Sequence, residues 1–265
     1  MLEIRDITKV YNPGTVAEQR LFDHFSLTVE TGQFVTIVGG NGSGKTSLLN
    51  ILCGSIPMDG GDVLIDGKSV RRLKDYRRYA DMGRVYQNPS AGTCPNLTML
   101  ENLSLADNKG KPFGLGWGVN RRRADAYREQ LRELGLGLED RLTSKVGLLS
   151  GGQRQALTLL MATLQRPKLL LLDEHTAALD PKTAKKVLDL TAEIVEEQHL
   201  TTLMITHNMK DAIQLGNRLI MMHEGNVIYD VAGEKKKNLT VEDLLHKFEE
   251  ASGEEFANDR MMLTK

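Results

Sequence analysis

The chain has 265 residues and a formal net charge of −1. This length allows one large domain, or a core with a smaller subdomain. The near-neutral charge excludes a strong overall attraction to nucleic acid or to anionic membranes. Two cysteines, Cys53 and Cys94, are too few for a disulfide framework, so we expect reduced thiols in a cytosolic protein. No apolar run approaches the roughly 18 residues of a membrane span, so any membrane crossing is expected from another chain.

The first third of the chain predicts antiparallel β-structure around the start of a parallel core. Alternating apolar and polar residues predict one or two half-buried strands in Leu2–Tyr11 and another strand in Phe22–Val29. The apolar run Phe34–Val38 predicts a buried strand, and Val63–Ile65 predicts a short one between two glycine turns.

The stretch after Val38 matches the phosphate-binding pattern G-x-x-x-x-G-K-[ST]. Its residues are Gly39, Gly40, Asn41, Gly42, Ser43, Gly44, Lys45 and Thr46. A helix is predicted at 47–53, with Gly54 at its end. A strand, a glycine loop and a helix N-terminus direct backbone N–H groups and a positive dipole end toward one point. We therefore expect Lys45 to reach the β- and γ-phosphates of a nucleotide, and the Thr46 hydroxyl to bind Mg²⁺.

The middle of the chain changes character twice. The basic stretch Lys68–Arg84 is interpreted as a solvated helix face rather than a nucleic-acid patch, because no aromatic stacking platform accompanies it. Arg84–Gln87 predicts a strand, which a following proline ends. Beyond it, Thr98–Ala106 and Arg121–Leu134 have helical periodicity, so a helical section is predicted.

A second glycine-containing motif precedes the helix that follows this section. Ser150 and Gln153 have the S-x-x-Q spacing of a capping box. The glycines between them, Gly151 and Gly152, each cost about 1 kcal/mol in a helix. They are expected where a backbone must approach a ligand closely. The sequence therefore predicts a second anion site at this helix N-terminus.

Acidic residues follow the next predicted strand. Leu169–Asp173 is continuously apolar up to Asp173, as expected of a parallel strand that is covered on both faces. Asp173 therefore lies at the carboxyl end of the strand, where P-loop ATPases have a carboxylate that organises Mg²⁺. Glu174 beside it can polarise an attacking water as a general base.

The last third predicts further α/β-structure. Asp180 and Pro181 have the pattern of an N-cap and first residue of a helix that runs to about Gln198. His207 follows a predicted strand at 201–205, so it leaves a carboxyl end of the sheet, where ligands collect in open α/β folds. After a helix capped by Asn208 and a hairpin, a capping box at Thr240 predicts a short helix.

The order of these motifs resembles the ATP-binding subunit of ATP-binding-cassette (ABC) transporters over nearly the whole chain. Gly39–Thr46 resembles the Walker A loop, Leu149–Gln153 the ABC signature and Leu169–Asp173 the Walker B strand. The resemblance implies an α/β fold: a P-loop NTPase core with a parallel central sheet, an N-terminal antiparallel β-subdomain and an inserted α-helical subdomain.

The resemblance also implies a domain plan, in which the whole chain is one ABC ATPase domain. Its core and antiparallel part would comprise residues 1–89 and 167–232, its helical subdomain residues 90–166, and its C-terminal helical tail residues 233–265. From the residues themselves we expect poor order after Gly253.

Roles for individual residues follow from the resemblance. Glu174 occupies the position of the catalytic glutamate, His207 that of the switch histidine and Gln87 that of the Q-loop. Asp180 fits the D-loop, although Ala178 stands where serine is commoner, and Tyr11 stands where the family has an aromatic ring that stacks on adenine. The catalytic residues implied are Lys45, Glu174 and His207. The implied Mg²⁺ ligands are Thr46, Gln87 and, through water, Asp173. The implied ATP-binding residues are Tyr11, Gly39, Gly40, Asn41, Gly42, Ser43, Gly44, Lys45, Thr46, Ser47, Gln87, Ser150, Gly151, Gly152, Gln153 and Asp180.

The resemblance implies partners as well as the cofactors ATP and Mg²⁺. Two copies would face each other head to tail, with Ser150 and Gly152 of one copy contacting the γ-phosphate that the other copy binds. A helix of a separate membrane permease would enter a groove near Gln87 and Thr93–Asn102. We expect a bacterial importer of a small solute at the cytoplasmic face of the membrane, with a substrate-binding protein and no direct nucleic-acid partner. Leu97–Ala106 and Gly151–Leu160 are similar to tryptophan/tyrosine-type amino-acid uptake cassettes.

Two other functions are considered. A soluble ABC ATPase could act on ribosomes or DNA without a permease, but such proteins usually carry two cassettes, long coiled coils or zinc modules, and this sequence has none of these signatures. A P-loop kinase or simple GTPase is disfavoured by the signature at Leu149–Gln153.

Overall fold

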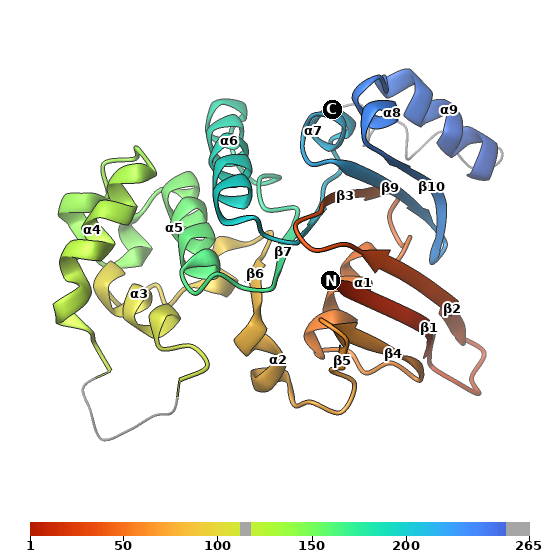
Figure 1. Cartoon of the computed structure of the whole chain (residues 1–265), viewed down its shortest axis with the longest axis horizontal. Helices are drawn as coiled ribbons and strands as arrows, with labels where there is room; N and C mark the ends of the chain where they lie inside the picture. The colour runs from red at the N-terminus through yellow and green to blue at the C-terminus, as the bar shows by residue number, and fades with distance from the viewer. Residues whose placement is uncertain (112–117, 253–265) are drawn as a thin grey trace. The chain divides into compact units, whose positions relative to one another are not determined.

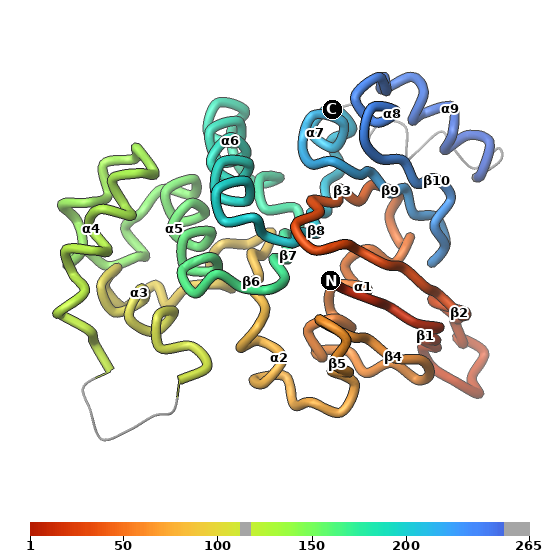
Figure 2. The backbone as a smooth tube through the Cα atoms, viewed as in Figure 1, coloured from red at the N-terminus to blue at the C-terminus, as the bar shows by residue number. Residues whose placement is uncertain are grey.

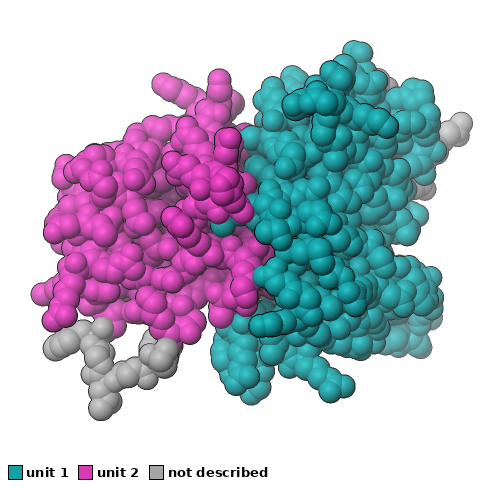
Figure 3. All heavy atoms as spheres, in the orientation of Figure 1, with its two compact units in different colours: residues 1–78, 200–265 teal, residues 79–199 magenta. Residues whose placement is uncertain are grey.

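The computed structural model of the chain describes residues 1–111 and 118–252 (Figure 1). The chain divides into two compact units, which Figure 3 distinguishes by colour. Unit 1 comprises residues 1–78 and 200–265, and unit 2 comprises residues 79–199. The end of the predicted tail, residues 253–265, lies outside the described residues. The predicted domain boundaries stay a prediction.

The N-terminal part of unit 1 is an antiparallel sheet in the strand order β2-β1-β4-β5. Its strands are β1 (Leu2–Tyr11), β2 (Gln19–Val29), β4 (Gly60–Ile65) and β5 (Lys68–Ser69). The register of β1 against β2 shifts between Ile4 and Ile7, which explains why the apolar alternation slips there. The prediction of one or two strands therefore resolves into one irregular strand.

The second sheet of unit 1 has the order β10-β9-β3-β8. Its strands are β3 (Phe34–Gly39), β8 (Thr202–Ile205), β9 (Arg218–His223) and β10 (Asn226–Ala232). β3 runs parallel to both β8 and β9, whereas β10 pairs antiparallel with β9. Every residue of β3 is buried, as expected for a central parallel strand covered on both faces.

Helices pack against this sheet. They are α1 (Lys45–Cys53), α7 (Met209–Gln214), α8 (Glu234–Lys237) and α9 (Val241–Ser252). Val38 of β3 and Met221 of β9 share an apolar core with Leu244 and Phe248 of α9. As predicted, α1 ends at Gly54, which has a left-handed conformation and donates its N–H to the carbonyl of Ile51. The tube in Figure 2 follows these connections along the chain.

The basic stretch before residue 84 contains α2 (Asp75–Asp81). Most of its side chains are exposed, but Arg78 is buried. The Arg78 guanidinium donates to the carbonyls of Ile51 and Leu52 at the end of α1 and to the carbonyl of Arg71. The prediction of a solvated face is therefore wrong at Arg78, because this side chain satisfies the last carbonyl groups of a neighbouring helix.

Unit 2 contains a pair of parallel strands and a set of helices. The strands are β6 (Met82–Val85) and β7 (Leu169–Asp173). The α-helices are α3 (Met99–Asp107), α4 (Ala124–Glu133), α5 (Gly151–Thr163) and α6 (Pro181–Gln198). Short 3₁₀ helices are η1 (Pro89–Gly92), η2 (Arg121–Arg123), η3 (Glu139–Arg141) and η4 (Val146–Leu148). α5 packs against β6, α3, α4 and α6, so it forms the centre of the unit. Among the helices that the structure describes, none is both long and apolar enough to cross a membrane.

Candidate functional site

The predicted phosphate-binding loop connects β3 to α1 in unit 1. α1 begins at Lys45, and its N-cap residue is Gly44, with a φ of 98°. The first turn of α1, which the structure describes in full, contains no acidic residue, and no side chain caps it. The N-terminus of a helix carries a partial positive charge, which favours an anion at the loop.

The Lys45 side chain folds back over the loop. Its Nζ donates to the carbonyl oxygens of Gly39 (2.8 Å) and Gly40 (2.7 Å) and to Ser43 Oγ (3.1 Å). Only 5% of Lys45 is exposed. A buried ammonium group needs hydrogen-bond acceptors or a counter-charge, and these three oxygens are among its acceptors. A phosphate would offer the same cation stronger, charged acceptors.

Gly39 shows why this loop requires glycine. A Cβ on Gly39 would lie 2.1 Å from the carbonyl oxygen of Met222 in β9, and its φ of +152° is one that other residues rarely adopt. The Gly225 N–H also donates to the carbonyl of Ser43 at 3.1 Å, so the loop is attached to the β9–β10 turn. These contacts fix the shape of the loop before any ligand binds.

Tyr11 and Ser47 lie together in unit 1. The Tyr11 hydroxyl is 3.5 Å from Ser47 Oγ in the first turn of α1. The Lys9 Nζ lies 5.4 Å from the centre of the Tyr11 ring. The structure therefore brings the ring at the end of β1 beside the phosphate-binding helix, whereas stacking on adenine stays a prediction.

His207 follows β8, and Asn208 after it caps α7 by accepting from the N–H groups of Lys210 and Asp211. β8 lies parallel to β3, with Ile205 opposite Ile37. His207 therefore leaves the sheet at the same edge as the phosphate-binding loop, as the sequence predicted.

In unit 2, β6 and β7 bring a second group of predicted residues together. Gln87 Nε2 donates to Glu174 Oε2 at 2.9 Å, although the two residues are far apart in the sequence. Asp173 is buried and forms an ion pair with Arg84, with 3.2 Å between Oδ2 and Nη2. The φ of Glu174 is 47°, a left-handed value that is uncommon for residues other than glycine. Such conformations cluster at functional sites.

The signature motif forms the N-terminus of α5, and the predicted capping box is present. Ser150 Oγ accepts from the Gln153 N–H at 3.3 Å, and the Ser150 N–H donates to Gln153 Oε1 at 3.2 Å. Gln153 Nε2 also donates to the carbonyl of Leu136 at 3.3 Å. The side chains of Ser150 and Gln153 therefore both form hydrogen bonds that stabilise the start of α5.

Gly152 has a packing role in addition to the one expected from the sequence. A Cβ on Gly152 would lie 2.0 Å from Thr183 Cγ2 in α6. Asp180 caps α6 by accepting from the Thr183 N–H at 3.1 Å. Hydrogen bonds from the Thr183 side chain and backbone hold the pKa of Asp180 below its ordinary value of 3.8. The signature and the predicted D-loop aspartate therefore share Thr183 as a neighbour.

Some residues that support these groups are not recognisable from the sequence. Arg84 belongs to the basic stretch that is predicted to be a solvated face, but it is the buried partner of Asp173, and its guanidinium lies 4.5 Å from the Tyr86 ring centre. β6 starts earlier than predicted, at Met82, and ends at Val85. Arg154 and Gln155 belong to none of the motifs recognised in the sequence, although both donate hydrogen bonds to the segment around Gln87.

A phosphate-binding loop between a parallel strand and a helix, together with acidic residues after a further strand, defines a P-loop nucleotide-binding protein. Comparison with known proteins is consistent with this class. The profile of the family described as ABC transporter matches residues 22–177. The chain is 47% identical over 251 residues to a tyrosine transport ATP-binding protein of Clostridioides difficile (strain R20291), covering 95% of this chain and 100% of that protein.

More distant relatives agree. A spermidine/putrescine import ATP-binding protein PotA of Pasteurella multocida (strain Pm70) is 32% identical over 91% of this chain, which spans only 62% of that relative. A solved dimeric structure of the ATP-binding cassette MJ0796, in a post-hydrolysis state bound to ADP and Pi, matches with a TM-score of 0.73 and 31% identity, covering 88% of this chain and 98% of that one.

The chain therefore belongs to the ABC transporter family, as an ATP-binding subunit with ATPase activity. The predicted fold class, an α/β ABC ATPase fold with a P-loop core, is confirmed by the match to this solved cassette structure.

Proposed function

We propose that the chain is the ATP-hydrolysing subunit of a bacterial importer for a small solute, most simply an aromatic amino acid such as tyrosine. The observation that carries this proposal is the 47% identity, over the entire length of the relative, to the tyrosine transport ATP-binding protein. The polyamine relative also supports import, but its identity is lower and the shared part is smaller. Cargo passes through a separate permease, so kinship is the only guide to its chemistry here.

Lys45 and the first turn of α1 would bind the phosphates of ATP. Lys45 would exchange the carbonyls of Gly39 and Gly40 for phosphate oxygens, since a charged acceptor forms the stronger hydrogen bond. Tyr11, beside Ser47 at the start of α1, would stack on the adenine ring.

Thr46, Gln87 and Asp173 would hold Mg²⁺. These residues offer hydroxyl, amide and carboxylate oxygens, the ligand type that Mg²⁺ prefers. Within residues 1–111 and 118–252, no group of three or more His, Cys, Asp or Glu side chains could hold a metal ion by itself. This fits an ion that is bound by few protein ligands together with substrate phosphates. Bound Mg²⁺ would neutralise the charge of the transferred phosphoryl group.

Glu174 would act as the general base that orients the attacking water. Its hydrogen bond from Gln87 fixes the direction of the carboxylate. His207 would donate to the γ-phosphate.

A second copy would complete each site. Ser150 and Gly152 of one copy would contact the phosphate bound by the other, and loss of the γ-phosphate would let the pair separate. Ser150 is exposed at the start of α5, and its capping role uses the hydroxyl oxygen as an acceptor, so its O–H can donate to a phosphate.

The permease would contact unit 2 at a cavity of about 200 Å³ whose lining includes Tyr79, Tyr86, Ala106 and Met161. This cavity lies next to the predicted groove, because Tyr86 directly precedes Gln87. Met161→Trp would fill the cavity, so we expect this variant to retain ATPase activity alone but to lose transport with the permease. Normal transport by Met161→Trp would contradict this contact.

The proposal locates the subunit at the cytoplasmic face of the membrane, with a substrate-binding protein delivering cargo and no nucleic-acid contact. The alternative is a soluble ABC ATPase that acts on ribosomes or DNA. Glu174→Gln tests the mechanism: it should bind ATP, form a stable dimer in size-exclusion chromatography and hydrolyse ATP very slowly. The exposed Glu133→Gln in α4 is the matched control and should behave as wild type.

The same trapped Glu174→Gln protein identifies the partner. Purified with ATP from gently solubilised cells, it should bring a multi-span membrane protein, which mass spectrometry identifies. Ribosomal proteins or DNA-repair factors in its place would support the alternative. A monomeric Glu174→Gln protein in the presence of ATP would refute the paired-site mechanism.

A further inference from the structure

The chain on both sides of Gln87 is hydrogen-bonded to adjacent residues of α5, through a backbone carbonyl on one side and a side-chain hydroxyl on the other. Gln155 Nε2 donates to the carbonyl oxygen of Tyr86 at 3.2 Å. Arg154 Nη1 donates to Ser90 Oγ at 3.0 Å. Because Tyr86 and Ser90 flank Gln87, a displacement of α5 would move both ends of this short segment together.

Two further contacts make this attachment stiff. The Asn88 side chain accepts from the Ser90 N–H at 2.9 Å, which closes the turn between the two attachment points. One helical turn further along α5, Thr158 lies so close to Gly92 that a Cβ on Gly92 would be 2.6 Å from Thr158 Cγ2. Residues 86–92 therefore contact α5 over more than one turn.

Arg154 is itself held in place. Its Nη2 donates to the carbonyls of Gly147 (3.1 Å) and of Leu149 (3.4 Å), the first residue of the signature motif. A single guanidinium therefore connects the chain before Ser150 with Ser90.

Gln155 stabilises the fold less than an apolar residue of similar size would at this buried position. The residue is fully buried, and its Oε1 has no hydrogen-bond partner among the described residues. A buried amide oxygen without a partner loses its hydration and gains nothing in return. An apolar side chain of the same length would fit this core position better. The hydrogen bond to Tyr86 is therefore the feature that only the amide provides.

We propose that Arg154 and Gln155 are positioning residues for the ATPase reaction, which set the place of Gln87 and, through its 2.9 Å hydrogen bond, the carboxylate of Glu174. This inference rests on the proposed function, in which Glu174 orients the attacking water. Under this proposal α5 couples the two motifs: a ligand that binds at Ser150 would change the position of the Glu174 carboxylate through a chain of direct contacts.

Gln155→Met tests the inference, because methionine keeps the length and removes the amide. Gln130→Met in α4 is the matched control, since the Oε1 of Gln130 is also buried without a partner in the described chain. We expect Gln155→Met to lower kcat about tenfold, which corresponds to about 1.4 kcal/mol. Its KM for ATP should stay within about twofold of wild type. Its stability in urea should change by less than about 1 kcal/mol, because losing the hydrogen bond to Tyr86 offsets removing the unpartnered amide oxygen. Gln130→Met should leave kcat unchanged.

An unchanged kcat in Gln155→Met would overturn the proposal. So would a loss of activity that parallels a loss of stability, since that result indicates a purely structural role. If Gln155→Met does not fold, the pair Arg154→Ala and Ser90→Ala decides. Each single variant should have a lower kcat than wild type. The kcat of the double variant should be no lower than that of the less active single variant, because both substitutions break the same contact. Additive losses would refute the link.

Glu174→Gln distinguishes a failure of the proposed catalytic role of Glu174 from a failure of the positioning role alone. If Glu174→Gln hydrolyses ATP normally, the proposed catalytic assignment fails, and the positioning role fails with it. If Glu174→Gln is inactive while Gln155→Met has the wild-type kcat, only the positioning role fails.

Discussion

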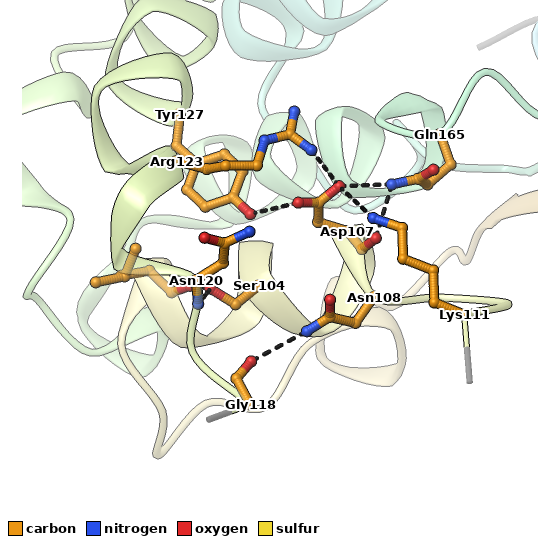
Figure 4. A network of polar contacts seen from close by, with 10 residues as sticks. Ser104, Asp107, Asn108, Lys111, Gly118, Asn120, Arg123, Tyr127 and Gln165 are labelled. Carbon is orange, nitrogen blue, oxygen red and sulfur yellow. Dashed lines mark hydrogen bonds and ion pairs between the residues drawn. The ribbon is translucent and has the colours of Figure 1, made fainter. Parts of the chain in front are cut away.

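Asp107, in the last turn of α3, accepts the hydrogen bonds of a polar network in unit 2 (Figure 4). Its carboxylate is fully buried; it accepts from the Tyr127 hydroxyl at 2.9 Å and forms ion pairs with Arg123 and Lys111. Gln165 Nε2, just beyond α5, donates to the Asp107 carbonyl oxygen at 2.7 Å. Burial alone would raise the pKa of Asp107, but the Tyr127 hydrogen bond and the two cations outweigh it and hold the pKa below 3.8.

Asp107→Ala should destabilise unit 2 by about 3 kcal/mol. The Tyr127 hydroxyl is fully buried and would lose its charged acceptor, a loss of roughly 1.5–3 kcal/mol. Arg123 and Lys111 are 39% and 50% exposed and can turn to water, so each adds about 0–1 kcal/mol. Because the pKa is depressed, this stabilisation is present above pH 3.8 and is lost as the pH falls below it.

Urea unfolding at pH 7, followed by circular dichroism, measures this loss. Asp107→Ala, Tyr127→Phe and the double variant form a cycle that isolates the pair. We expect Tyr127→Phe in the Asp107→Ala background to restore stability, since it removes the hydroxyl that has lost its acceptor. Hydrogen exchange should accelerate in the amides of α4 (Ala124–Glu133). A loss below about 1 kcal/mol for Asp107→Ala, or strictly additive effects in the cycle, would refute this account of the network.

Gly39→Ala should lower nucleotide affinity at least tenfold in a titration with a fluorescent ATP analogue, because its Cβ would lie 2.1 Å from the Met222 carbonyl oxygen; unchanged affinity would show that the loop can shift. Gly152→Ala should destabilise the protein by about 1–3 kcal/mol through overpacking. Thr183→Ser, which removes the methyl group that the new Cβ would meet, should restore most of this loss in thermal unfolding. Burial lowers the pKa of His175 from 6.5 to about 4. The unfolded chain therefore binds the extra proton first, and stability should fall as the pH drops from 6.5 to 4, by up to about 3.5 kcal/mol at about 1.4 kcal/mol per pKa unit. A stability curve of the nucleotide-free protein over this range should flatten in His175→Asn.

Features that depend on neighbours in the sequence were predictable without the structure. The glycine loop, its flanking strand and helix, and the Gly54 helix end all follow from local periodicity and backbone preference. The capping boxes that begin at Ser150 and Thr240 are present for the same reason, since each is complete within four residues.

Features that depend on distant contacts were not predictable in this way. Arg78 and Arg84 belong to one basic stretch, yet each is buried against a partner that only the fold brings near. The left-handed conformation of Glu174 likewise has no signal in its own side chain, because other residues than glycine adopt it only when their surroundings enforce it. The charge pattern of a segment predicts the average exposure of its side chains, whereas the exposure of each residue depends on its own contacts in the fold.

Ser150 combines the capping role that the structure shows with the phosphate contact that we propose for it. As an N-cap it accepts from the Gln153 N–H, which uses a lone pair of Oγ and leaves the hydroxyl hydrogen to be donated. An Asp or Asn would cap α5 as well, but Asp brings a negative charge that would repel a phosphate, and Asn donates from its amide nitrogen, a different atom from the carbonyl oxygen that caps. Serine is the smallest residue that caps the helix and still offers a donor at the same atom. Under the proposed paired-site mechanism, in which Ser150 contacts a phosphate, a serine at this position meets both requirements, since neither capping nor phosphate binding alone excludes the other candidates.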